Sequence, residues 1–113
     1  MSFEPHRPVD SARKRMITRQ QCSDLISYNQ IATKLSCARS TQRYFEKLIT
    51  LCKQDNLMTR RKAYSIVLRT TKYTREELIK KLFEELAIKY KTRKGGYTRL
   101  LKTSEGKFLV QLV

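Results

Sequence analysis

The segment from Thr74 to Gly96 constrains the fold more than any other part of the sequence. Thr74-Arg75-Glu76-Glu77 has the pattern of a capping box, in which the Thr74 hydroxyl and the Glu77 carboxylate bond to free backbone N–H groups. Apolar residues then recur at helical spacing, at Ile79, Leu82, Phe83, Leu86 and Tyr90. Gly95-Gly96 ends the pattern, because glycine adopts left-handed conformations at little cost. The sequence therefore predicts a core helix followed by a reversal of the chain.

A β-hairpin is predicted after this reversal. Its strands cover residues 97–103 and 108–113, with a turn at Ser104-Glu105-Gly106-Lys107 between them. Gly106 suits the left-handed position of a short hairpin loop, and the second strand is rich in residues that favour strands.

A first helix and a short strand are predicted near the beginning of the chain. Two prolines keep residues 1–9 extended, and Asp10 or Ser11 then caps a helix that runs to about Tyr28. Residues 30–34 alternate in polarity, which is typical of a brief strand with one half-buried face.

Two more helices lie between this strand and Thr74. From Ser36 to about Gln54, apolar residues fall on one helical stripe, at Ala38, Phe45, Leu48, Ile49 and Cys52. Thr59 is expected to cap a third helix that turns Ala63, Ile66 and Val67 inward. The elements together predict an α+β fold with a helix, a short strand, three helices and a C-terminal β-hairpin. We expect an extended arm over residues 1–9 and a single domain over residues 10–113.

Net charge narrows the function further. The chain has 25 Lys and Arg residues against 10 Asp and Glu residues, a formal charge of +15. Such a protein repels itself unless a polyanion lies close by, and nucleic acid is the first candidate. Spanning a membrane is disfavoured, because no apolar run approaches the roughly 20 residues needed to cross a bilayer. Binding on a membrane surface is disfavoured because the basic helices lack an exposed Trp/Phe face.

The cations are placed unevenly along the predicted helices. Four of them crowd the first half of the first helix, and Arg60, Arg61 and Lys62 are predicted in the opening turn of the third. Arg39, Arg43 and Lys47 recur every four residues on one face of the second helix. A helix N-terminus disfavours cations, so this placement has an electrostatic cost. An anion outside the chain would offset that cost.

The segment from Lys91 to Arg99 places cations on both sides of the glycine pair. Its backbone can approach a phosphodiester chain closely. Tyr97 has two readings, as a ring that stacks on a base or as a ring that packs in the core.

Catalysis, metal binding and small-molecule cofactors are not expected. The carboxylates mostly pair with lysines along helices, and no glycine-rich loop leads from a strand into a helix. Cys22, Cys37 and Cys52 form no CxxC pair and His6 is the single histidine, so standard zinc spacings are absent. We interpret the cysteines as ordinary thiols of a reducing compartment.

One motif resembles a known family. The run from Arg93 to Lys102, Arg-Lys-Gly-Gly-Tyr-Thr-Arg-Leu-Leu-Lys, is similar to the signature of the bacterial-type large-subunit ribosomal protein L17 family. The resemblance extends over roughly Met16 to Val113. It implies the same order of elements, arranged as a two-layer α+β unit. It also implies binding to large-subunit ribosomal RNA near the outer opening of the peptide exit tunnel, and contacts with neighbouring ribosomal proteins. The chain departs from the family pattern in its short N-terminal arm and its tight hairpin turn.

The resulting hypothesis is a structural rRNA-binding protein with no small-molecule substrate, in the cytoplasmic ribosome of a bacterium or in a mitochondrial or plastid ribosome. The alternatives are a free DNA- or RNA-binding regulator, which would bind selectively away from the ribosome, and an interfacial membrane protein. The residues predicted to contact RNA are Arg13, Lys14, Arg15, Arg19, Lys34, Arg39, Arg43, Arg60, Arg61, Arg93, Lys94, Gly95, Gly96, Tyr97, Arg99 and Lys102.

Overall fold

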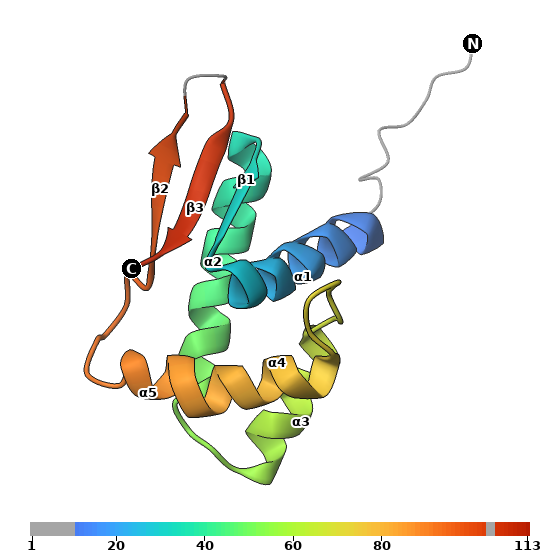
Figure 1. Cartoon of the computed structure of the whole chain (residues 1–113), viewed down its shortest axis with the longest axis vertical. Coiled ribbons are helices and arrows are strands. Elements are labelled where there is room, and N and C mark those ends of the chain that lie inside the picture. Colours follow the sequence, from blue (N-terminus) through green and yellow to red (C-terminus); the bar gives the residue numbers. More distant parts are fainter. Residues whose placement is uncertain (1–10, 104–105) are drawn as a thin grey trace.

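The computed structural model describes residues 11–103 and 106–113 (Figure 1). The predicted arm over residues 1–9, the predicted cap Asp10 and the turn residues Ser104 and Glu105 lie outside the described residues. Helix α1 (Ser11–Tyr28) ends where the sequence predicts. Asn29 follows it with a φ of 68°, and this left-handed residue turns the chain into strand β1 (Gln30–Thr33).

The three strands form one antiparallel sheet in the order β1-β3-β2. Strands β2 (Thr98–Lys102) and β3 (Phe108–Leu112) are the predicted hairpin, and Gly106 has the expected left-handed φ of 78°. The hairpin inserts β3 between β2 and β1, so that Val110 pairs with Leu100 on one side and Ile31 on the other. The last strand in sequence is therefore the central strand of the sheet.

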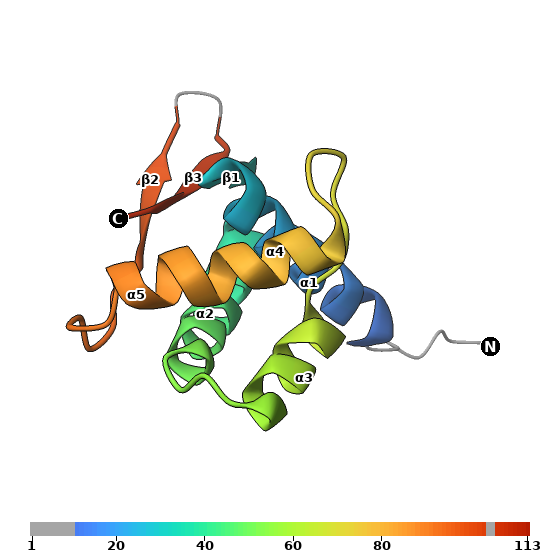
Figure 2. The ribbon, with the colours of Figure 1, turned by 60° about the horizontal axis from the view of Figure 1, so that its bottom comes forward.

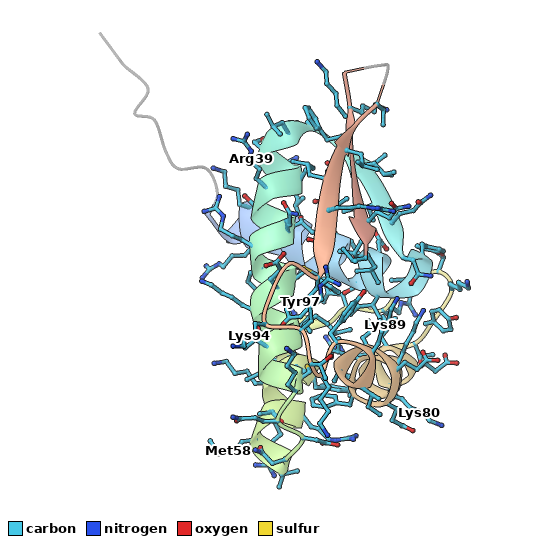
Figure 3. All side chains as sticks on the ribbon, turned by 90° about the vertical axis from the view of Figure 1, so that its left-hand side faces the viewer. Arg39, Met58, Lys80, Lys89, Lys94 and Tyr97 are labelled. Atoms are coloured by element: carbon cyan, nitrogen blue, oxygen red, sulfur yellow. The ribbon has the colours of Figure 1, made fainter. Side chains whose placement is uncertain are left out.

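Helix α2 (Leu35–Cys52) runs along one face of the sheet (Figures 1 and 3). Ile31, Leu100 and Phe108 turn toward that face and pack against the buried core. The predicted stripe of α2 is confirmed, because all five of its apolar residues are buried: Ala38, Phe45, Leu48, Ile49 and Cys52. The molecule thus has the predicted two layers.

Helix α3 (Leu57–Ile66) begins earlier than predicted. Asn56 is the N-cap: its side chain accepts a hydrogen bond from the Thr59 N–H at 2.9 Å, and the Thr59 hydroxyl accepts one from the Asn56 N–H at 3.0 Å. The prediction that Thr59 caps the helix is wrong, since it is the third helical residue of a capping box. Arg60 and the two cations after it consequently follow the opening residues instead of opening the helix themselves.

Helix α4 (Arg75–Lys81), the π-helical turn η1 (Leu82–Leu86) and α5 (Ala87–Lys89) form one continuous rod (Figure 2). The Thr74 capping box is confirmed, and the five predicted core residues of this rod are all buried. The π turn is a difference from the prediction. Buried positions recur every four residues from Leu78 to Tyr90, which is more than the 3.6 residues of an α-helical turn. The wider turn keeps these side chains on one side of the rod.

Candidate nucleic-acid interface

Three cations lie on the face of α2 opposite the core, and we call Arg39, Arg43 and Lys47 the α2 basic face. Each of these side chains is exposed, and none makes an intramolecular hydrogen bond or ion pair with the residues that the structure describes. The four-residue spacing explains their alignment, because residues four apart are neighbours on a helix surface. The side chains are therefore free to meet a ligand.

The turn between α5 and β2 brings a second predicted cluster to this face. Lys94 and Gly95 line a surface depression of about 400 Å³ together with Arg43, Lys47 and Thr50 of α2. Figure 3 shows Arg39 and Lys94 on the same side of α2. The structure thus unites two groups of cations that are about fifty residues apart in the sequence, a proximity that spacing alone does not reveal.

Tyr97 holds this turn from inside. Its ring is 1% exposed, and its hydroxyl donates to the carbonyl oxygen of Arg93 at 3.2 Å. The Lys53 ammonium donates to the same oxygen and lies 4.7 Å from the centre of the Tyr97 ring. Of the two readings of Tyr97, the core reading agrees with the structure, and stacking on a base is wrong because the ring is covered.

The two glycines of the motif differ. Gly96 has a φ of 65°, whereas Gly95 lies outside the left-handed region. A Cβ at either position would meet no atom within 4 Å. Backbone conformation, and not space, is therefore the reason for glycine, and it applies to Gly96 alone.

Arg60 and Arg19 are turned toward the protein itself. The Arg60 guanidinium donates to both carboxylate oxygens of Asp55, at 2.6 and 2.9 Å, and lies over the Phe83 ring. Arg19 donates to the backbone carbonyls of Ser65 and Ile66 at the end of α3, at 2.7 and 2.9 Å. Both cations still add to the positive field, but their hydrogen-bonding groups already have partners.

A third engaged arginine was not among the predicted site residues. Arg75 donates to the Val67 carbonyl at 2.9 Å, one residue beyond the end of α3, and lies 4.7 Å from the centre of the Tyr64 ring. Arg19 and Arg75 thus approach the same helix end from α1 and α4. Its exposed carbonyls carry partial negative charge, which explains the attraction.

The other predicted residues are exposed but do not form one patch. Arg13, Lys14 and Arg15 lie at the beginning of α1, on the side of the molecule away from β2 (Figure 1). Arg99 donates to Gln111 at 2.9 Å across the outer face of the sheet. The remaining exposed cations of the predicted set are Lys34, Arg61, Arg93 and Lys102.

The described residues form neither a metal cluster nor a membrane-spanning helix. No group of three or more His, Cys, Asp or Glu side chains that could hold a metal ion occurs in residues 11–103 and 106–113. No described helix is both long enough and apolar enough to cross a membrane.

Comparison with known proteins identifies the family. The family model described as "Ribosomal protein L17" matches residues 17–108. Proteins named "Large ribosomal subunit protein bL17" include one from Malacoplasma penetrans, which is 41% identical over 107 residues covering 95% of this chain and 90% of that protein. The one from Ureaplasma parvum is 45% identical over 91 residues covering 80% and 76%. The one from Zymomonas mobilis is 45% identical over 92 residues covering 81% and 61%. This chain is a member of the ribosomal protein L17 family.

Proposed function

We propose that this chain is a structural component of the large ribosomal subunit and binds large-subunit rRNA there. The observation that carries the proposal is the match to the family over residues 17–108, together with a basic face whose cations lack internal partners. The resemblance supports a position near the outer opening of the peptide exit tunnel, beside other ribosomal proteins, in the cytoplasmic ribosome of a bacterium. The role is architectural, with neither catalysis nor a cofactor.

The α2 basic face and Lys94 are the centre of the proposed interface. One arginine and two lysines, Arg43, Lys47 and Lys94, line a shallow depression instead of a deep pocket, which suits a phosphodiester backbone. Glu46 lines it too, but its carboxylate accepts a hydrogen bond from the Thr98 hydroxyl. Arginine forms paired hydrogen bonds to phosphate, and lysine acts as a compact charge. Contacts of this kind fix the position of a protein on RNA without reading its sequence.

The remaining exposed predicted cations extend the contact in this proposal. Arg13, Lys14 and Arg15 reach RNA from the beginning of α1, and Arg99 and Lys102 reach it from β2. Since these elements point in different directions, the RNA would surround the protein on more than one side. A charge of +15 requires a comparably distributed polyanion.

Sedimentation of cell lysate through a sucrose gradient tests the proposal. The wild-type chain is expected to migrate with large subunits after a moderate salt wash. An Arg43→Gln, Lys47→Gln double variant should dissociate during that wash. A matched double variant, Lys80→Gln with Lys89→Gln, loses the same charge from the other side of the molecule (Figure 3) and should remain bound.

Two outcomes would contradict the proposal. A soluble pool away from ribosomes with sequence-selective binding would favour a free regulator. If both double variants dissociated from large subunits equally, the assignment to the α2 basic face would be contradicted. Bulk charge alone would then explain the binding.

A further inference from the structure

A second hollow lies outside all the predicted site residues. It has a volume of about 830 Å³ and is bounded by the end of α1, by β1 and by the loop between α3 and α4. Figures 1 and 2 show this loop beside α1. We call it the Asp24 groove, after one of its lining residues; the others used below are Gln20, Tyr28, Arg69, Thr71 and Lys72.

The Asp24 groove presents an aromatic ring beside cations. Tyr28 is 42% exposed, and its hydroxyl is fixed by a 2.8 Å hydrogen bond to Thr71. The Lys72 ammonium lies 5.7 Å from the centre of the Tyr28 ring, and Arg69 is exposed on the same loop. An exposed ring held in place next to cations is the arrangement on which proteins stack unpaired bases.

Asp24 is unusual in this cationic chain. Its carboxylate is half-buried and accepts one hydrogen bond, from Gln20 Nε2 at a long 3.5 Å. Within the described residues the ion pair is Arg60 with Asp55, so Asp24 has no cation in contact. Burial raises the pKa of this carboxyl, and the Gln20 hydrogen bond offsets only part of that effect. A partly desolvated carboxylate with unused acceptor capacity is suited to a ligand that donates N–H groups.

We propose that the Asp24 groove binds an unpaired guanine nucleotide of RNA, with the base on Tyr28, its N1–H and N2–H groups on the Asp24 carboxylate, and its phosphate near Arg69 and Lys72. This inference rests on the proposed function and adds a site to it. Guanine presents two adjacent N–H donors, which match the two oxygens of a carboxylate. Uracil presents one such donor, and adenine and cytosine place a ring-nitrogen acceptor beside their amine, which a carboxylate repels.

A basic protein side chain is the other ligand that a carboxylate attracts. Glu77 also lines the groove, but its carboxylate already accepts a hydrogen bond from the Thr74 N–H at 2.9 Å. Arg69 and Lys72 on the loop disfavour a basic ligand, because they would repel a second cation entering the groove. They attract a phosphate, which every RNA nucleotide carries. The combination of ring, carboxylate and cations therefore favours a nucleotide over a lysine or arginine of a neighbouring protein.

The test uses the full chain and fluorescent RNA hairpins that differ at one position. One hairpin is fully paired, and the others carry a single bulged G, A, C or U. Binding is measured by fluorescence anisotropy at one fixed salt concentration. The wild-type chain is expected to bind the bulged-G hairpin about tenfold more tightly than the paired hairpin, with smaller gains for the other bases. Tyr28→Ala should abolish this preference, and Tyr28→Phe should keep most of it because the ring remains.

The charge of Asp24 gives the sharpest control. Removing a negative charge strengthens non-specific attraction to RNA, so Glu85→Gln, on the exposed side of η1, should bind every hairpin slightly more tightly. Asp24→Asn removes the same charge but should weaken binding to the bulged-G hairpin about tenfold relative to the paired hairpin. The two variants have equal net charge, so bulk electrostatics cannot explain affinities for the bulged-G hairpin that change in opposite directions. Thermal melting of each variant checks that it is folded.

The outcomes separate this site from the general proposal. Salt-dependent binding to the paired hairpin without any preference for bulged G would overturn the groove and leave the proposed function standing. So would a preference for the bulged-G hairpin that survives in Asp24→Asn. Absence of binding to every hairpin at low salt would count against RNA binding as a whole.

Discussion

Gly95 and Gly96 are neighbours with different conformational demands. Only Gly96 has a left-handed backbone, and neither has an atom within reach of an added Cβ. We expect Gly96→Ala to lower the free energy of unfolding by about 1 to 2 kcal/mol. Gly95→Ala should be neutral or stabilise by a few tenths of a kcal/mol, because it restricts the unfolded chain. Urea denaturation of both variants checks this, and equal losses would contradict the conformational argument.

The three thiols differ in reactivity. Burial raises the pKa of Cys22 to about 12, and burial with the Asp55 carboxylate nearby raises that of Cys52 to about 12. Cys37 is half-exposed on α2. Because the thiolate is the reactive form, Ellman's reagent at pH 8 should modify Cys37 quickly and the buried pair only at the rate of unfolding. Three fast thiols in the native protein would contradict this burial.

The same shifts predict how stability depends on pH. A thiol whose pKa is higher in the folded than in the unfolded chain contributes stability that is complete at neutral pH. That contribution is lost as the pH rises from about 9 toward 12. Cys22→Ala should therefore show a smaller loss of unfolding free energy over this range than the wild-type chain. Parallel curves would show that the Cys22 thiol does not govern the loss.

Residue types and spacings predicted which side chains are buried and which cations are exposed. They did not always predict the hydrogen-bond and packing partners of those side chains. The contact of Arg60 with Phe83 depends on how α3 meets the rod formed by α4, η1 and α5. Tyr97 had two readings in sequence because a ring after a glycine turn can face either way. Tertiary contacts decided between them.

At the scale of elements, the C-terminal end of α3 is held by cations from two other helices. Arg19 donates to the Ser65 and Ile66 carbonyls and Arg75 to that of Val67. We expect Arg19→Gln to lower the free energy of unfolding by about 1 to 3 kcal/mol, since bonds from a charged donor are lost at a partly buried helix end. Arg15→Gln removes an exposed cation of the same helix and should change stability by less than about 0.5 kcal/mol.

Thermal or urea unfolding distinguishes these two variants, and RNA affinity provides a second measurement. Arg15 is free to bind phosphate, so its loss should reduce the salt dependence of RNA binding by about one unit of slope. Arg19 is engaged, so its loss should change that slope little. The reverse pattern would mean that Arg19 leaves α3 when RNA binds.

The order and type of the elements were predictable because their signals are local. Capping boxes, apolar spacing and glycine turns act within a few residues, and the predicted ends of α1 and of the hairpin strands agree with the structure to within one residue. The start of α3 was predicted too late because Thr59 and Asn56 are both good caps, and their reciprocal bonds show only in three dimensions. The π turn of η1 was missed because the apolar positions in sequence, such as Ile79, Leu82, Phe83 and Leu86, are three, four and seven residues apart, spacings that also fit an ordinary α-helix.

At the scale of the molecule, charge is the dominant property. If six to ten phosphates are neutralised, affinity for rRNA should fall by about three to five decades between 50 and 200 mM salt, through counterion re-association. The Arg43→Gln, Lys47→Gln double variant should reduce the slope by about two units. Filter binding at several salt concentrations measures both, and affinity that is flat across this range would contradict a mechanism based on phosphate contacts.

The candidate interface was only half visible in the sequence. The stripe of Arg39, Arg43 and Lys47 follows from helix geometry, whereas the approach of Lys94 depends on the path of the chain between α5 and β2. The Asp24 groove has no sequence signature at all. It combines residues from α1, β1 and the loop before α4 that no local pattern connects.

The central position of β3 has a consequence for the time at which the protein can fold. Strand β1 pairs only with β3 in the described sheet, so Ile31 must wait for Val110, which follows every helix along the chain. During synthesis the helices leave the exit tunnel first. At that moment β3, the central strand of the sheet that covers them, has not yet emerged. Non-local pairing of this kind slows folding. The sheet therefore closes as a late event, when the helical layer is already available as its template.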